Sequence, residues 1–240
     1  MIKSALQWIT DLRKPNLELV GNQTWSDKPM SRIAYNPKAK ALRLTSLTSL
    51  VQYLLSGCDG TSGRKLIVHV ISPWCISVFS HMDDECERDE YLEVCAMTPE
   101  FKFDTFIGHE EFCIGLQSKF IDAGDRSLLL KFAGTVEAGS VSEYGDDGVT
   151  QKATVKTGIA SKSDAIVPNP VRLSPYRTFL EVPQPESTFV FRMQQDKYGP
   201  VKCALFECDG GAWKMEAKES ILRYLTSELE DIRENILILS

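Results

Sequence analysis

Histidine is scarce in this chain of 240 residues, which has only three of them. General acid–base catalysis and metal-assisted hydrolysis need histidine, cysteine or carboxylate groups that converge on one point. His109-Glu110-Glu111 resembles the start of a zinc-protease His-Glu-x-x-His motif, but position 113 is cysteine and no second histidine follows. We therefore predict no catalytic residues and a protein that is not an enzyme.

Glycine-rich loops that cradle phosphates are missing as well. The chain has neither a Gly-x-x-x-x-Gly-Lys sequence nor a Gly-x-Gly-x-x-Gly sequence, and Gly210-Gly211 suits a tight turn with positive φ. We expect no ATP or NAD chemistry and no cofactor.

Cysteines are present, but not in a pattern that binds metal or builds a disulfide framework. There are seven, an odd number at scattered spacings, and no two of them form a Cys-x-x-Cys pair. Free cysteine behaves as a small apolar residue. We expect reduced, mostly buried thiols and no metal site.

Long apolar runs are also missing. Nowhere do about 18 consecutive apolar residues occur, as a membrane-spanning helix requires. The first residues mix Trp8, Asp11 and Arg13 with apolar neighbours, which is unlike a signal peptide. These features predict a soluble, cytoplasmic protein with no membrane partner.

The net charge of −6 is concentrated in one segment. Residues 81–93 hold seven acidic residues and one arginine, which already sums to −6. Residues 149–192 hold six basic and three acidic residues, so this segment is locally basic at +3. A protein that coats nucleic acid is usually basic overall, so general nucleic-acid binding is less favoured than a local anion site.

Apolar periodicity predicts a mixture of helices and strands. Helices are expected at 2–13, 46–56, 110–120 and 218–235. Strands are expected at 66–71, 74–80, 91–97, 127–133, 135–144, 149–157, 187–194, 201–208 and 212–216, with Asp209-Gly210-Gly211 as a hairpin turn before the last.

These elements predict an α+β fold. A largely antiparallel sheet is expected from residues 127–217 in the C-terminal half, with flanking helices and a closing C-terminal helix. We expect a single mixed domain over 1–240, with lobes at 1–125 and 126–240 as the alternative. The apolar stripe of the last helix and the final Ile-Leu-Ile-Leu predict a homo-oligomer.

Arginine and aromatic residues gather in the C-terminal half. The candidate ligand-binding residues are Tyr176, Arg177, Arg192, Trp213 and Lys214. An arginine fork suits phosphate or carboxylate, and an aromatic face suits a base, so this set points to an anionic, nucleotide-like ligand. In the alternative, Tyr176 and Trp213 anchor the core while the arginines pair with acids.

Several segments of the chain resemble a known family. They are DDGVTQKATVKTGI, VPNPVRLSPYRTF, QPESTFVFR and CALFECDGGAWK, together with TSLTSLVQYL, LIVHVISP and HEEFCIGLQSKF. They are similar to the YfdQ-like family of phage and prophage proteins, a domain of unknown function. The resemblance implies a viral protein in the cytoplasm of a bacterial host, but no activity.

Three functions are compatible with these observations. The first is a non-enzymatic phage protein that sequesters an anionic nucleotide-type immune signal of the host. The second is a recombination or replication accessory that contacts single-stranded DNA through residues 149–192. The third is a structural protein of the phage particle.

Overall fold

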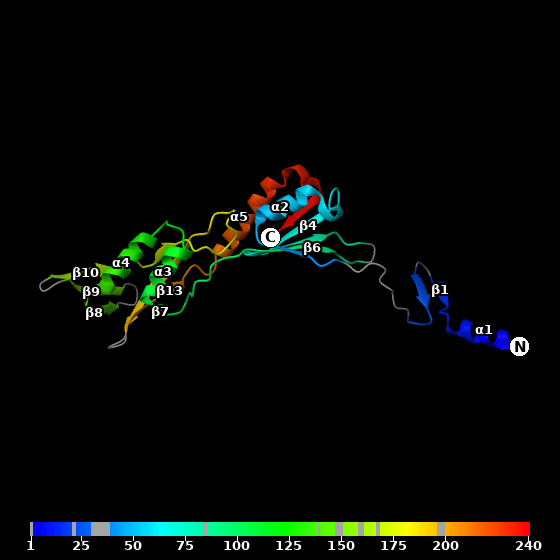
Figure 1. Cartoon of the computed structure of the whole chain (residues 1–240), viewed down its shortest axis with the longest axis horizontal. Helices are drawn as coiled ribbons and strands as arrows, with labels where there is room; N and C mark the ends of the chain where they lie inside the picture. Colours follow the sequence, from blue (N-terminus) through cyan, green and yellow to red (C-terminus); the bar gives the residue numbers. More distant parts are fainter. Residues whose placement is uncertain are drawn as a thin grey trace. The chain divides into compact units, whose positions relative to one another are not determined.

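The computed structural model describes residues 2–20, 23–29, 39–83, 86–138, 140–146, 151–157, 161–166, 169–195 and 200–240 (Figure 1). Contacts group the chain into two compact units, Met1–Ala39 and Lys40–Ser240. This boundary differs from the 125/126 division considered from the sequence. A single domain over 1–240 stays a prediction.

The N-terminal unit contains one helix and one hairpin. Helix α1 (Ile2–Arg13) has the bounds that the apolar spacing predicted. Strand β1 (Leu17–Val20) pairs antiparallel with β2 (Gln23–Ser26) as a two-stranded sheet.

A five-stranded sheet forms the centre of the second unit. Its strands, in spatial order, are β14 (Ile236–Leu239), β4 (Leu66–Ser72), β5 (Cys75–Ser80), β6 (Glu90–Cys95) and β3 (Leu42–Leu44). The middle three are antiparallel, whereas the two edge strands run parallel to their neighbours. Helices α2 (Leu47–Ser56) and α5 (Trp213–Glu228) lie on one side of this sheet (Figure 1).

Alternation along the strands explains this layering. Successive side chains of a strand point to opposite faces, so every second residue reaches the helices. The buried strand residues are Leu66, Val68, Val70, Ile76, Val78, Leu92 and Val94, and they share one core with Leu47, Leu50, Leu54, Ile221 and Leu225 of the helices. The residues between them lie on the other face of the sheet.

Helix α2 has a defined cap at each end. The Ser46 hydroxyl oxygen accepts a hydrogen bond from the Ser49 amide (3.2 Å). Gly57 ends the helix with φ of 67°, a left-handed conformation that glycine adopts without a Cβ penalty. The prediction of helix 46–56 is therefore confirmed.

A second core lies between a four-stranded sheet and two further helices. The sheet has the order β11 (Val171–Leu173), β12 (Ser187–Gln195), β13 (Val201–Glu207) and β7 (Ile107–Gly108). Helices α3 (His109–Lys119) and α4 (Arg126–Ala138) contribute to the same core. Its largest fully buried side chains are Phe112, Phe120, Phe189, Phe191 and Leu116.

A three-stranded antiparallel sheet follows α4. Its order is β10 (Ser161–Ile166), β9 (Gln151–Thr157) and β8 (Ser140–Asp146). The sequence Asp146-Asp147-Gly148, which predicts a tight turn between two strands, falls mostly outside the described residues. Short 3₁₀ helices at Cys58–Gly60 and Glu230–Asn235 complete the elements.

Two strand predictions are corrected by the structure. Helix α4 covers residues 126–138, so the strand predicted at 127–133 is wrong, and so is the first part of the strand predicted at 135–144. The run Leu128-Leu129-Leu130 is compatible with either period. In the structure Leu129, Phe132 and Ala133 share the buried face at helical spacing. The segment therefore forms a helix, because the helical spacing places these apolar residues in the second core.

The hairpin predicted after Asp209 is also wrong. Gly210 and Gly211 do have positive φ, but the turn leads into α5, which begins at Trp213 instead of residue 218. Trp213, Ala217, Ile221 and Leu225 are all buried at intervals of four residues. The apolar stripe of this helix thus belongs to the protein's own core.

The C-terminal residues form a strand instead of an unpartnered tail. β14 pairs in parallel with β4, in the register Ile236 with Leu66. The two sequence features that predicted a homo-oligomer are therefore largely explained within the chain. The α+β class and the antiparallel-rich sheets are confirmed, although the central sheet is built from residues 42–95 and 236–239 and not from the C-terminal half.

Candidate functional site

Arg177 is the centre of a buried polar cluster. It lies between β11 and β12 and is 8% exposed. Its Nη1 donates to Glu207 Oε1 at 2.6 Å, and its Nη2 donates to the Ser187 hydroxyl oxygen. The guanidinium also stacks on the Trp213 ring, 3.9 Å from the ring centroid. One arginine thus joins β12, β13 and the start of α5.

A carboxylate extends this cluster at the turn before α5. The Ser187 hydroxyl donates to Asp209 Oδ2 at 2.5 Å, and the Gly211 amide donates to Asp209 Oδ1 at 2.9 Å. Burial opposes ionisation of Asp209, but these hydrogen bonds and the Arg177 charge outweigh it and lower the pKa of the carboxyl group. Asp209 is therefore ionised at neutral pH.

The charge of Arg177 is balanced inside the protein. Burial lowers the pKa of the guanidinium to about 10, although Glu207 and Asp209 both favour its charged form. Arg177 stays protonated at neutral pH, and its fork is directed to Glu207 and Ser187. This arrangement matches the alternative in which the arginine pairs with acids, and it leaves little positive charge for an anionic ligand.

The five candidate ligand-binding residues are only partly brought together. Lys214 is exposed, and its Nζ lies 5.9 Å from the centroid of the Trp213 ring on which Arg177 stacks. Tyr176 is partly exposed, and its backbone amide donates to the Lys119 carbonyl oxygen. Their role in ligand binding stays a prediction.

Arg192 lies away from this cluster. It is on β12, where it pairs with Ala204, and its guanidinium donates to the Phe191 carbonyl oxygen at 3.1 Å. From Ser187 to Arg192 the extended strand rises by about 16 Å. Arg192 and Arg177 were grouped from the sequence because the sequence alone does not show that the strand separates them.

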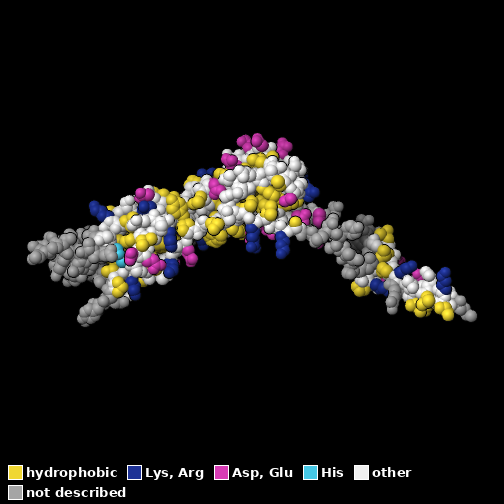
Figure 2. Space-filling view, in the orientation of Figure 1, with side chains coloured by type: hydrophobic (Ala, Val, Ile, Leu, Met, Phe, Trp, Pro, Cys, Tyr) yellow, Lys and Arg dark blue, Asp and Glu magenta, His cyan; other side chains and the backbone are white. Residues whose placement is uncertain are grey.

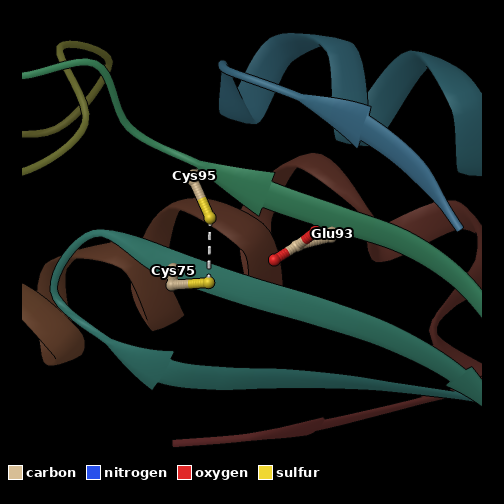
Figure 3. A group of neighbouring side chains, drawn as sticks. All are labelled: Cys75, Glu93 and Cys95. Carbon is tan, nitrogen blue, oxygen red and sulfur yellow. Dashed lines mark hydrogen bonds between the residues drawn. The ribbon is translucent and has the colours of Figure 1, made fainter.

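A second group of polar side chains lies on the face of the central sheet away from the helices. Cys75 of β5 and Cys95 of β6 are direct register partners, and their Sγ atoms are 3.0 Å apart. Glu93 precedes Cys95 by two residues and lies on the same side of β6. Figure 3 shows the two thiols pointing toward each other and the Glu93 carboxylate directed to them.

Backbone hydrogen bonding explains why the two thiols are so close. The Ala96 amide donates to the Trp74 carbonyl oxygen at 2.8 Å, one residue beyond the Cys75–Cys95 pair on each strand. Cys75 and Cys95 therefore form a non-hydrogen-bonded pair, in which Cα atoms are about 4.5 Å apart and side chains are closest. Burial, the hydrogen bond with Cys95 and the Glu93 charge together raise the pKa of Cys75 to about 11.

Sequence reasoning missed this cysteine pair. The two residues are 20 positions apart, and only the register of β5 against β6 places them opposite each other. The expectation of mostly buried thiols is also wrong, because Cys203 alone is buried among the seven free cysteines. A prediction that the two strands pair antiparallel would have been the signal that could bring the two cysteines together.

A cavity of about 420 Å³ beside α3 does not bring its charged side chains together on one point. Its lining residues are Glu100, Phe101, Lys102, Ile107, Glu111, Gly115 and Lys119. Lys102 pairs with Glu111 at 3.4 Å, and the Lys119 ammonium donates to the Glu100 carbonyl oxygen. The two cations of this cavity are thus held by neighbouring acceptors.

The N-terminal unit exposes an unusual amount of apolar surface. Ile2 of α1 is 80% exposed, Leu19 of β1 is 71% exposed, and the other exposed apolar residues of this unit are Leu6, Trp8, Ile9, Leu12, Leu17, Val20 and Trp25. Figure 2 shows hydrophobic side chains along one side of α1 and basic side chains on the other. Among the described residues of this unit, none of the apolar side chains is buried.

Comparison with known proteins identifies no relative, because no protein family, no curated protein and no solved structure matches the chain. The resemblance to the YfdQ-like family stays a prediction. In the part of the chain that the structure describes, no helix is long and apolar enough to cross a membrane.

Proposed function

We propose that the protein is a non-enzymatic binding protein that assembles with further copies of itself through its N-terminal unit. The observation that carries this proposal is the apolar surface of α1 and of the β1–β2 hairpin, which these elements do not bury among themselves. Apolar surface of this extent is a feature of interaction sites.

The small size of the N-terminal unit is the first reason to expect a partner surface. An isolated helix of 12 residues is marginal in water, and so is a single two-stranded hairpin. Both gain stability when an apolar face packs on another surface. The N-terminal unit therefore requires a partner surface to become well ordered.

A second copy of the chain offers a suitable surface. Strands β3 and β14 are the edges of the central sheet, and an edge strand presents unpaired backbone donors and acceptors. Leu42 of β3 and Leu237 and Leu239 of β14 are about half exposed at these edges. A hairpin from another copy supplies both the backbone groups and the apolar side chains that such an edge lacks.

Mutual docking would give a closed assembly. If each N-terminal unit docks on the partner's central sheet, the two contacts are equivalent, which is the arrangement of a two-fold symmetric dimer. A dimer of this kind could also serve as a building block of a phage particle, which is the third function considered from the sequence.

Sequestration of an anionic nucleotide is now less well supported. It relied on Arg177, whose guanidinium is directed to Glu207 and Ser187 inside the protein. Contact with single-stranded DNA relied on residues 149–192, where the register pairs Lys156 with Lys162 on β9 and β10. A steep loss of oligonucleotide affinity with salt would support that function instead.

The deciding experiment is the molar mass in solution, measured by size-exclusion chromatography with light scattering over a range of concentrations. We expect a multiple of the 26.9 kDa chain mass for the wild type. Serine at Ile2, Leu6 and Ile9, which share one face of α1, should give a monomer.

A second variant of α1 controls for the effect that serine itself has on helix content. Serine at Gln7 and Asp11, on the opposite face of α1, should leave the molar mass of the wild type unchanged. A wild type that is monomeric at every concentration, or an apolar-face variant that still assembles, contradicts the proposal.

A further inference from the structure

Cys75, Cys95 and Glu93 form a set of metal-ligand atoms. The two Sγ atoms and one carboxylate oxygen all lie within 4.8 Å of one another. Within the described residues this is the only group of three histidine, cysteine or acidic side chains with this spacing. The group is held by the registers of two neighbouring strands, so its geometry does not depend on a loop.

The chemistry of the donors selects the class of ion. Thiolate ligands favour thiophilic divalent cations such as Zn²⁺, whereas Ca²⁺ and Mg²⁺ take oxygen ligands. We propose that Cys75, Cys95 and Glu93 bind a thiophilic divalent cation of the Zn²⁺ class, with two thiolates and one carboxylate as ligands. On binding, each thiol releases its proton to solvent.

The distances fit such an ion after a small adjustment. A tetrahedral Zn²⁺ with bonds of about 2.3 Å to sulfur places two thiolates about 3.8 Å apart. The Sγ atoms are now 3.0 Å apart, so the site has to widen by less than 1 Å. Rotation of the two partly exposed side chains supplies this, because neither is enclosed by the core.

Arg43 orients the carboxylate of this site. Its Nε donates to Glu93 Oε2 at 2.9 Å from the adjacent strand β3. This bond uses one carboxylate oxygen, and the other oxygen is the one we assign to the metal. A partner that holds a ligand in place in this way strengthens metal binding. Because all three ligands are only partly buried, a water molecule or a group from a partner protein can complete the coordination.

The test is a titration of the reduced, full-length protein with Co²⁺ under anaerobic conditions, followed by displacement with Zn²⁺. We expect a near-ultraviolet thiolate-to-cobalt charge-transfer band and the visible bands of tetrahedral Co²⁺, at one ion per chain. Cys75→Ser and Cys95→Ser should each abolish the charge-transfer band of this site. Glu93→Gln should weaken Co²⁺ binding by at least about tenfold.

Other cysteines provide the matched control. Cys58 and Cys208 are exposed and lie outside the site, so Cys58→Ser and Cys208→Ser should keep the full signal. Circular dichroism of each variant confirms that it is folded. A second readout is the melting temperature, which Zn²⁺ should raise in the wild type and in Cys208→Ser but not in Cys75→Ser.

Two results would overturn the proposal. One is a charge-transfer band that survives in the Cys75→Ser/Cys95→Ser double variant, which would place the ion elsewhere. The other is the absence of any charge-transfer band in protein whose thiols are shown to be reduced. If such protein is instead converted by a small-molecule disulfide to a form with Cys75 and Cys95 linked, the pair is a redox pair and not a metal site.

Discussion

Helices α1 and α2 have similar amphipathic patterns, yet their apolar residues lie in opposite environments. Leu47 and Leu50 of α2 are fully buried, whereas Ile2 and Leu6 of α1 are 80% and 59% exposed. Both helices could be predicted from apolar spacing alone. The difference is that α2 packs on a sheet within its own unit, while the N-terminal unit lacks a sheet large enough to cover α1.

The comparison indicates two uses of the same pattern. In the second unit, apolar stripes build a core within the unit itself. In the N-terminal unit, we propose that they form a surface for association. Changes in the two units should therefore affect different properties: stability in the second unit and assembly in the first.

The largest loss of stability is expected from the ion pair of Arg177 with Glu207 in the second unit. Arg177→Ala removes a side chain that is 9% exposed, together with its stack on Trp213, and leaves the Glu207 carboxylate, which is 29% exposed, without its partner. We expect a loss of about 3–5 kcal/mol in the free energy of unfolding, measured by urea titration. Lys14→Ala, which breaks the exposed pair of Lys14 with Asp11 in the first unit, should cost less than about 1 kcal/mol. Equal effects would contradict the distinction between the units.

A slightly smaller loss is expected from the core of α2. Leu50→Ala removes a fully buried side chain and should cost about 2–5 kcal/mol by the same measurement. The matched change Leu6→Ala on α1 should alter the stability of the second unit by no more than about 0.5 kcal/mol. If both variants lose the same amount, α1 packs in the core of its own chain.

Glycine substitutions should have opposite signs at two helix positions. Gly57→Ala places a Cβ in the left-handed conformation and 3.0 Å from Ser62 Cβ, so we expect a loss of about 1–2 kcal/mol. Gly134→Ala, inside α4 with no atom within 4 Å of the new Cβ, should gain about 0.5–1 kcal/mol. Thermal unfolding measures both, and a loss at Gly134 would argue against the helix there.

The smallest effect concerns the acid sensitivity of the second unit. The pKa of Asp209 is lower in the folded protein than in the unfolded chain, so its stabilising effect is present above the unfolded pKa of about 4. This stabilisation is lost as the pH falls through the lower, folded pKa. Asp209→Asn should therefore be less stable than the wild type at pH 7, and the difference should shrink at lower pH. A difference that does not vary with pH would exclude this carboxylate as the cause.

Local patterns in the sequence predicted many of the helices and strands. The bounds of α1, the extent of α2 and the strands β12 and β13 all follow from residues close together in the chain. The apolar run from Leu128 fits both periods, so only the second core decides that α4 is a helix. The same limit explains why the turn at Asp209 was predicted to join two strands.

The candidate sites were harder to predict, because they depend on register. Arg177 and Trp213 were identified, but the pairing of Arg177 with Glu207 depends on how β13 lies beside the segment between β11 and β12. Cys75 and Cys95 come together only because β5 and β6 pair in one register, since a shift of one residue would turn one thiol to the other face.

Hydrogen exchange of the α1 and α2 amides, measured at several protein concentrations, tests the contrast between the two units most directly. We predict that protection of α1 rises with concentration, because α1 is ordered by a second copy, and that protection of α2 stays high throughout. Protection of α1 that is already as high as that of α2 at the lowest concentration, and does not change, would contradict assembly through the N-terminal unit.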